Sequence, residues 1–144
     1  MHGRRVFKRI FYVLFDRLKI RRFRDHLFFG SLLPGSAIVA DFGAHRGQFF
    51  AALKSNYSIS RALLVEANPV LADPPKKTFA GTDVLHAALI GGNNRDRVTF
   101  TRSTQLESSS IFGEWAAAWC GRPVEVPAAE LASVIRELGG EWTW

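Results

Sequence analysis

Residues 38–49 constrain the fold of this chain more than any other segment. Their sequence, Ile-Val-Ala-Asp-Phe-Gly-Ala-His-Arg-Gly-Gln-Phe, passes from a β-branched apolar run through two glycines into an amphipathic segment. This order predicts a strand, a tight turn and the start of a helix. In an open α/β sheet such a turn lines a nucleotide pocket at the carboxyl end of the first strand. Gly43 permits a sharp turn, and Gly47 permits a ligand or a neighbouring strand to approach closely.

The spacing of these glycines narrows the choice of ligand. The pattern is G-x-x-x-G, which differs from the G-x-G-x-x-G of pyrophosphate binders and favours an adenosyl group with an amino-acid tail. A second apolar run, at 61–66, ends in Glu66, 19 residues after Gly47. A carboxylate at the end of the second strand can accept hydrogen bonds from ribose hydroxyls. Asn68 and the proline after it predict a turn.

The remaining pattern predicts an alternation of strands and helices. We expect strands at 37–42, 61–66, 82–87 and 97–102, and helices at 46–56, 111–120 and 128–138, the last stopped by Gly139. A polar loop is expected at 104–110. The helix that would follow the second strand, at 71–77, is expected to be broken by Pro74 and Pro75. The sequence therefore predicts an α/β domain over 36–144, preceded by an arm and linker over 1–35.

Four short motifs resemble those of the FkbM-type methyltransferases. They are Asp-Phe-Gly-Ala-His-Arg-Gly-Gln-Phe at 41–49, Val-Glu-Ala-Asn-Pro at 65–69, His-Ala-Ala-Leu at 86–89 and a serine-rich segment at 107–111. The resemblance covers residues 38–138. It departs from the family pattern at His45, where the family favours Asn, and at Ala67, where it favours Pro.

The resemblance implies a Rossmann-like, class I methyltransferase-like open sheet that binds S-adenosylmethionine and transfers its methyl group to a hydroxyl oxygen. The acceptor would be a small molecule or a glycan, such as a sugar or a secondary metabolite. The implied cofactor-binding residues are Asp41, Gly43, Ala44, Gly47, Gln48, Glu66, Asn68, His86 and Ala87. Asp41 and the glycines would surround the methionine part, Glu66 would hold the ribose, and His86 with Ala87 would border the adenine.

Each of these residues also has an ordinary structural interpretation. The glycines could serve the turn alone, Asp41 could be a helix N-cap, and Glu66 could be a solvated strand end. His45 could contact substrate or cofactor, but it is interpreted as an exposed loop residue. No side chain is identified as a general base, so the catalytic residues are unassigned.

In the family, a fourth strand with a Lys-x-Asp run follows the segment that ends this sequence. We therefore expect a sheet that is incomplete at its C-terminal side, corresponding to the N-terminal half of a methyltransferase. Such a chain is expected to be inactive alone and to self-associate through an uncovered edge. Two other classes stay open. One is a non-enzymatic or split fragment that needs a second polypeptide. The other is a nicotinamide-dependent oxidoreductase, although the G-x-x-x-G spacing of this sequence fits that class less well.

Charge is concentrated at the N-terminus. Residues 1–24 carry nine basic side chains and one acidic one, whereas the rest carry ten basic and twelve acidic ones. This distribution argues against a nucleic-acid footprint across the domain. Apolar residues recur at steps of three and four, which predicts a basic amphipathic helix over 4–28: Val6, Phe7, Ile10, Phe11, Leu14, Phe15 and Leu18.

That helix has three interpretations: packing on the domain edge, lying on an anionic membrane surface, or contacting nucleic acid. No secretory signal peptide is recognised, although the Arg-rich composition also matches a mitochondrial-type leader. The single Cys120 excludes an internal disulfide and a cysteine-based zinc site. The four histidines are widely separated, which argues against metal ligation. The expected location is the cytoplasm, with peripheral membrane contact as the alternative.

Overall fold

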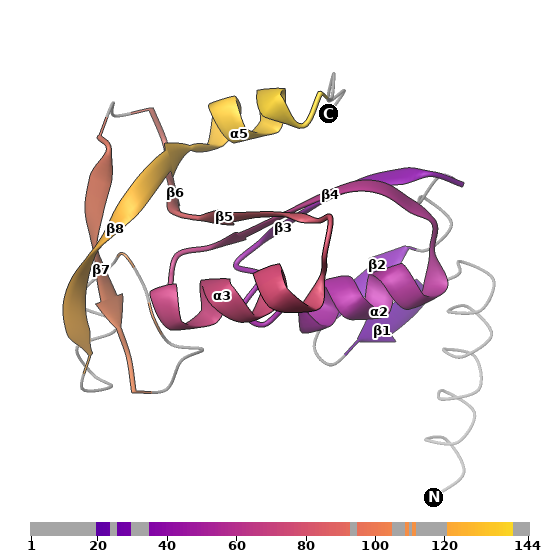
Figure 1. Cartoon of the computed structure of the whole chain (residues 1–144), viewed down its shortest axis with the longest axis horizontal. Coiled ribbons are helices and arrows are strands. Elements are labelled where there is room, and N and C mark those ends of the chain that lie inside the picture. The colour runs from indigo at the N-terminus through magenta and orange to yellow at the C-terminus, as the bar shows by residue number, and fades with distance from the viewer. Residues whose placement is uncertain are drawn as a thin grey trace, which may run out of the picture.

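The computed structural model describes residues 20–23, 26–29, 35–92, 95–104, 109, 111 and 121–139. Its centre is a parallel sheet of β3 (Ala37–Phe42), β4 (Ile59–Glu66) and β5 (Asp83–His86), in the order β3-β4-β5. The helices α2 (Gln48–Asn56) and α3 (Pro69–Thr78) cover one face, and α5 (Leu131–Glu137) packs over the other (Figure 1). The predicted α/β class with a parallel sheet is confirmed.

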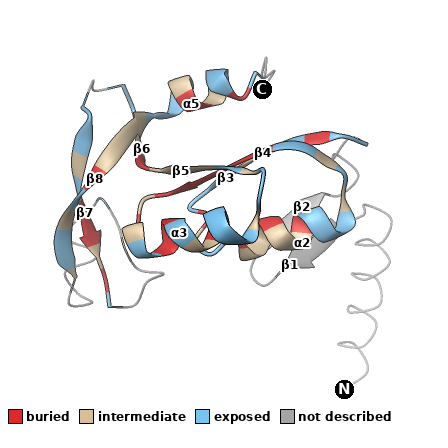
Figure 2. Ribbon diagram, in the orientation of Figure 1, coloured by how far each residue is buried: buried red, intermediate tan, exposed pale blue. Residues whose placement is uncertain are grey.

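From Ala62 to Glu66 the central strand β4 is buried on both faces, as expected for the middle of a parallel sheet (Figure 2). Successive side chains of a strand point to opposite faces, so Ala62 and Leu64 join one core cluster while Leu63 and Val65 join another. The first cluster includes Phe50 of α2, and the second includes residues at and just after α5: Val134 and Leu138. β4 therefore links both layers of helices.

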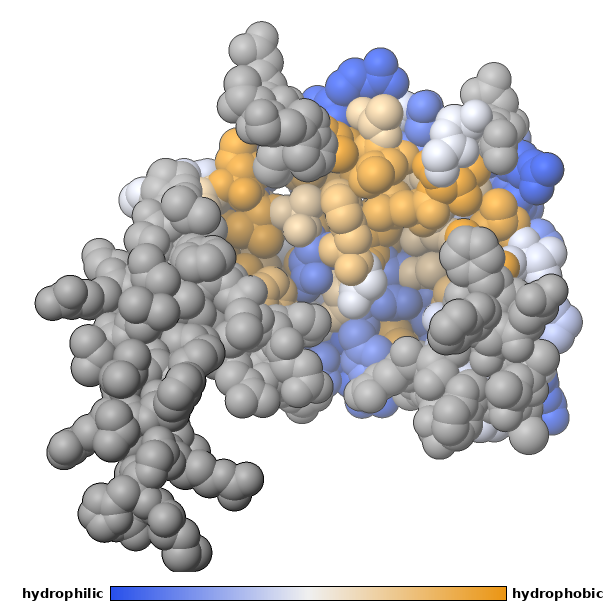
Figure 3. All heavy atoms as spheres, turned by 180° about the vertical axis from the view of Figure 1, so that it is seen from behind, coloured by the Kyte–Doolittle hydropathy of each residue, from blue (hydrophilic) through white to orange (hydrophobic). Residues whose placement is uncertain are grey.

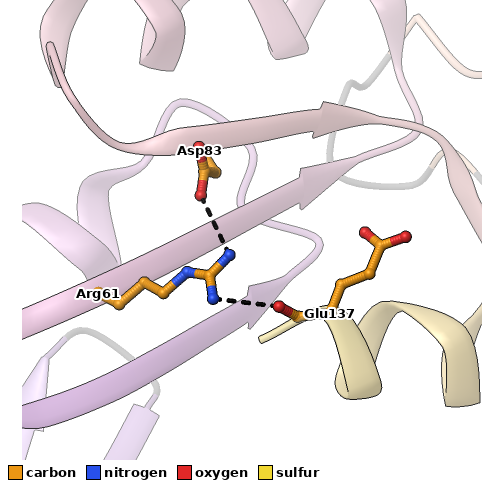
Figure 4. A network of polar contacts seen from close by, with 3 residues as sticks. All are labelled: Arg61, Asp83 and Glu137. Carbon is orange, nitrogen blue, oxygen red and sulfur yellow. Dashed lines mark hydrogen bonds and ion pairs between the residues drawn. The ribbon is translucent and has the colours of Figure 1, made fainter. Parts of the chain in front are cut away.

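α5 is also held by a polar contact with the sheet. Arg61 of β4 donates from Nη1 to the main-chain oxygen of Glu137 at 3.1 Å, and its Nη2 lies 3.9 Å from Oδ2 of Asp83 (Figure 4). A cation at the last turn of a helix bonds the carbonyls that have no partner within the helix. Gly139 follows with a φ of 73°, as the predicted helix stop requires.

The predicted break at Pro74 and Pro75 is wrong, because α3 runs without interruption from Pro69 to Thr78. The two prolines remove two main-chain donors, but the helix is short and ends soon after them. The Asn68 side chain caps its start by accepting from the Val70 N–H. Leu71, Ala72 and Pro75 of this helix are buried, and burial of apolar side chains favours the folded helix despite the lost hydrogen bonds.

A second sheet follows the first without a connecting loop. β5 is separated from β6 (Ala88–Ile90) by Ala87 alone, and β6 pairs in parallel with β8 (Arg122–Glu130). β8 also pairs antiparallel with β7 (Arg97–Arg102), which gives the order β6-β8-β7. Neither β6 nor β8 was predicted, and residues 128–130, expected to begin the last helix, are strand. Ala and Glu favour helices locally, but here pairing with β6 decides their conformation.

The N-terminal helix predicted over 4–28 is wrong where the structure can be compared with it. β1 (Ile20–Phe23) and β2 (His26–Phe29) form an antiparallel pair. The apolar periodicity that predicted the helix ends at Leu18, so it gave no support for extending the helix into these aromatic and β-branched residues. Residues 4–19 of the arm, residues 112–120 of the helix predicted over 111–120, and most of the polar loop lie outside the described residues. Within the described part, none of the helices has the length and apolar character needed to cross a membrane.

Candidate binding site at the carboxyl ends of the parallel strands

The implied cofactor-binding residues lie at or next to one edge of the first sheet. β3, β4 and β5 run in the same direction, and their registers place Phe42 beside Val65 and Glu66 beside His86. The segments 43–45, 66–68 and 86–87 therefore meet where the strands end. This carboxyl edge is where open α/β sheets bind ligands.

Glu66 is the centre of this edge. Its side chain is buried, with 7% of the residue exposed, so the interpretation as a solvated strand end is wrong. Oε2 accepts the His45 N–H at 2.8 Å, and Oε1 accepts the Asn68 N–H at 2.7 Å. One carboxylate thus holds the turn after β3 and the turn after β4. Each oxygen keeps a further lone pair for another donor.

The glycine turn is held by main-chain bonds from its own residues. The N–H groups of Gly43 and Ala44 both donate to Val65 O, at 2.9 and 3.0 Å. Gly43 has a φ of 80°, and no atom of the described residues lies within 4 Å of a Cβ placed on it. Within the described part of the chain the space over Gly43 is therefore open, which suits close approach of a ligand.

Gly47 has a different reason to be glycine. Its φ is 74°, and a Cβ at this position would overlap the ring of Phe79, which follows α3. The close neighbour is therefore a side chain of this protein, where the sequence had suggested a ligand or a strand. Gly47 is also the N-cap of α2, and Asp41 lies within β3, so Asp41 is not the cap of that helix. Gln48 begins α2 and is partly buried, and Ala44 is buried in the core beneath it.

His45 and Asn68 each place a polar atom inside the protein. The ring Nε2 of His45 and the side-chain Nδ2 of Asn68 are buried, and neither has a hydrogen-bond partner among the residues that the structure describes. His45 is partly buried and has a φ of 53°, so its interpretation as an exposed loop residue is wrong. The burial of this ring nitrogen could not be predicted from the sequence, because it depends on how the chain folds around it.

At the end of β5, the third strand of this sheet, the histidine side chain is bonded to the protein's own main chain. His86 is partly buried, and its Nε2 lies 3.2 Å from Ala67 O. Because a carbonyl can only accept, Nε2 carries the proton in this contact. Ala87 is 2% exposed. Among the residues that the structure describes, no group of three or more His, Cys, Asp or Glu side chains is arranged to hold a metal ion.

Fold and site together define an α/β protein with a buried carboxylate and an open glycine turn at the carboxyl edge of a parallel sheet. Comparison of the chain with protein-family models, curated protein sequences and solved structures finds no match.

Proposed function

We propose that this edge binds S-adenosylmethionine and that the chain belongs to an enzyme that methylates a hydroxyl group of a small molecule or glycan. The observation that carries the proposal is the Glu66 carboxylate beside the open space over Gly43. A ribose hydroxyl can donate to a carboxylate lone pair, and an amino-acid tail can pass over a residue that lacks a side chain. When bound, S-adenosylmethionine supplies the activated methyl group.

The residues of this chain would hold and orient that group. Glu66 would accept from the ribose, the turn at Gly43 would border the methionine part, and Ala87 with its neighbour His86 would border the adenine. Fixing both reactants in line accounts for much of the acceleration of a methyl transfer. Among the described residues no side chain is assigned as the general base.

A further observation supports a need for additional polypeptide. Among the described strands β3 lies at the edge of the first sheet, and its Ile38 and Phe42 are exposed at 42% and 44%. Parallel strands are normally covered on both faces and paired on both sides. Figure 3 also shows a broad hydrophobic area on the side turned away in Figure 1. We propose that β3 pairs with another strand, either from a second polypeptide or by self-association of this chain.

The test is a comparison of two ligands by calorimetric titration and thermal shift. S-adenosylhomocysteine should bind and raise the melting temperature, because a ligand that binds only the folded state stabilises it by mass action. Glu66→Gln should weaken binding by about 1–3 kcal/mol, the range for a lost hydrogen bond to a charged group. Glu137→Gln, on the exposed end of α5, is the matched control and should bind as the wild type does.

The oxidoreductase alternative is decided by the same titration. A carboxylate after the second strand also serves the ribose of NAD. Tighter binding of NAD than of S-adenosylhomocysteine would overturn the methyltransferase proposal. The G-x-x-x-G spacing favours the opposite order of affinities.

A further inference from the structure

Two arginines face each other at one end of the ribbon formed by β7 and β8. Arg102 is the last residue of β7 and lies directly opposite Arg122, the first residue of β8, in the antiparallel register (Figure 1). Residues paired in this way have Cα atoms about 4.5–5.5 Å apart and side chains on the same face of the sheet. The main chain of the two strands therefore holds two positive charges next to each other.

The face of the ribbon that carries this arginine pair is identified by its neighbours. Because side chains alternate along a strand, Arg102 shares a face with Phe100, two residues before it. Arg122 shares the same face with Val126. Phe100 and Val126 are buried in a core cluster against which Ala67, of the turn after β4, also packs. The arginine pair thus lies on the face of the ribbon that adjoins the carboxyl edge of the first sheet.

No acidic side chain neutralises the arginine pair within the described part of the chain. Neither Arg102 nor Arg122 makes a hydrogen bond or an ion pair with a residue described there. Glu125 of β8 lies on the opposite face of the ribbon. There its Oε1 accepts from Thr99 at 2.6 Å, and its main-chain oxygen accepts from Arg97 at 2.8 Å.

Such a pair is unfavourable for the fold by itself. Like charges directly opposite each other destabilise a sheet. Arg102 is also partly buried, which adds to the cost of a charge that has no partner. An anion bound between the two guanidinium groups would replace this repulsion with two attractions. The pair is therefore explained better by an anionic ligand than by the stability of the ribbon.

We propose that Arg102 and Arg122 together bind the phosphate group of a small phosphomonoester, such as a phosphorylated sugar. Each guanidinium presents a planar fork of N–H donors that matches the oxygen atoms of a phosphate. The two positive charges balance the charge of about −1.5 to −2 that a phosphomonoester carries at neutral pH. A carboxylate or a phosphodiester carries a single negative charge and leaves one arginine unbalanced. This site is separate from the one proposed for S-adenosylmethionine and does not depend on it.

The test is calorimetric titration with glucose 6-phosphate, with glucose as the uncharged reference and at constant ionic strength. The variants are Arg102→Gln, Arg122→Gln and a double variant that combines Arg102→Lys with Arg122→Lys. Arg95→Gln is the matched control, because Arg95 is exposed just before β7 and lies outside the pair. Urea unfolding without phosphate measures the stability of each variant separately.

The wild type should bind glucose 6-phosphate and not glucose. Arg102→Gln and Arg122→Gln should each bind it about tenfold more weakly, as expected for one lost hydrogen bond to a charged group, and Arg95→Gln should bind normally. The double lysine variant should also bind more weakly, because it keeps both charges but lacks the forked donors. Without phosphate, both glutamine variants should unfold at the same urea concentration as the wild type or a higher one, because each removes the repulsion.

Several results would overturn the inference. One is a wild type that does not bind glucose 6-phosphate. Another is an equal loss of binding in Arg95→Gln, or full binding by the double lysine variant, since either would show a general effect of positive charge. Tighter binding of a single-stranded oligonucleotide would assign the pair to phosphodiesters. Arg102→Gln should bind S-adenosylhomocysteine as the wild type does, and a loss there would make the arginine part of the other site.

Discussion

Gly43 and Gly47 have nearly the same backbone conformation but different surroundings, so alanine at each position separates backbone strain from steric overlap. Both have positive φ, 80° and 74°. An L-residue in the left-handed region costs roughly 1–2 kcal/mol. Gly43→Ala adds a methyl group to open space and should cost that amount alone.

Gly47→Ala should cost more because the added methyl overlaps Phe79. The Cβ would lie 3.3 Å from Cζ and closer still to Cε2 of that ring. The ring cannot move freely, since it packs edge-on against Phe50, which is 1% exposed, at a centroid distance of 5.1 Å. Overpacking of this kind adds roughly 1–3 kcal/mol, for a total of about 2–5 kcal/mol.

Urea unfolding at equilibrium would measure both free energies. In addition, Gly47→Ala combined with Phe79→Leu should be less destabilised than the sum of the two single changes, because the smaller side chain removes part of the overlap. Equal costs for Gly43→Ala and Gly47→Ala, or strict additivity in the double variant, would refute the assignment of Phe79 as the neighbour that requires glycine.

Two further predictions concern the helix with internal prolines and the exposed strand edge. Pro74→Ala restores a main-chain donor within α3 and should raise the free energy of unfolding by about 1–2 kcal/mol in the same urea assay; unchanged or lower stability would show that the ring packs favourably enough to compensate. Ile38→Thr keeps a β-branched residue on β3 while removing apolar exposure, and should reduce self-association in sedimentation velocity experiments. A sedimentation profile identical to that of the wild type would place the association surface elsewhere.

The sequence predicted the elements whose signal is local. The bounds of β3 and β7 agree with the predicted 37–42 and 97–102, because each is a short β-branched run between turn residues. Two parts of β8 were missed for different reasons. Residues 128–130 include helix-forming alanines and are extended through pairing with β6. Residues 122–127 pair with β7 although they contain two prolines, which argue against a strand in the sequence. The N-terminal helix was extended too far because an amphipathic pattern was continued past its last repeat.

Some features of the candidate site could likewise be predicted from the sequence, whereas others depend on packing. Glu66 and the glycine turn were found because their spacing is a sequence property. The contact between Gly47 and Phe79 depends on packing between α2 and the end of α3, which no local pattern encodes. The enclosed nitrogens of His45 and Asn68 likewise depend on burial, which the sequence does not report.

The passage of β5 into β6 limits how this protein can respond to a ligand. β5 belongs to the first sheet and β6 to the second, and a single alanine with 2% exposure separates the two strands. Hinge closure of two lobes around a ligand needs several hinge residues that absorb the change in φ and ψ. Here only Ala87 connects β5 to β6, so such a closure would have to be absorbed at that one residue. We therefore expect a largely preformed site, in which adjustment is confined to side chains and turns and the rate of association is not limited by a domain motion.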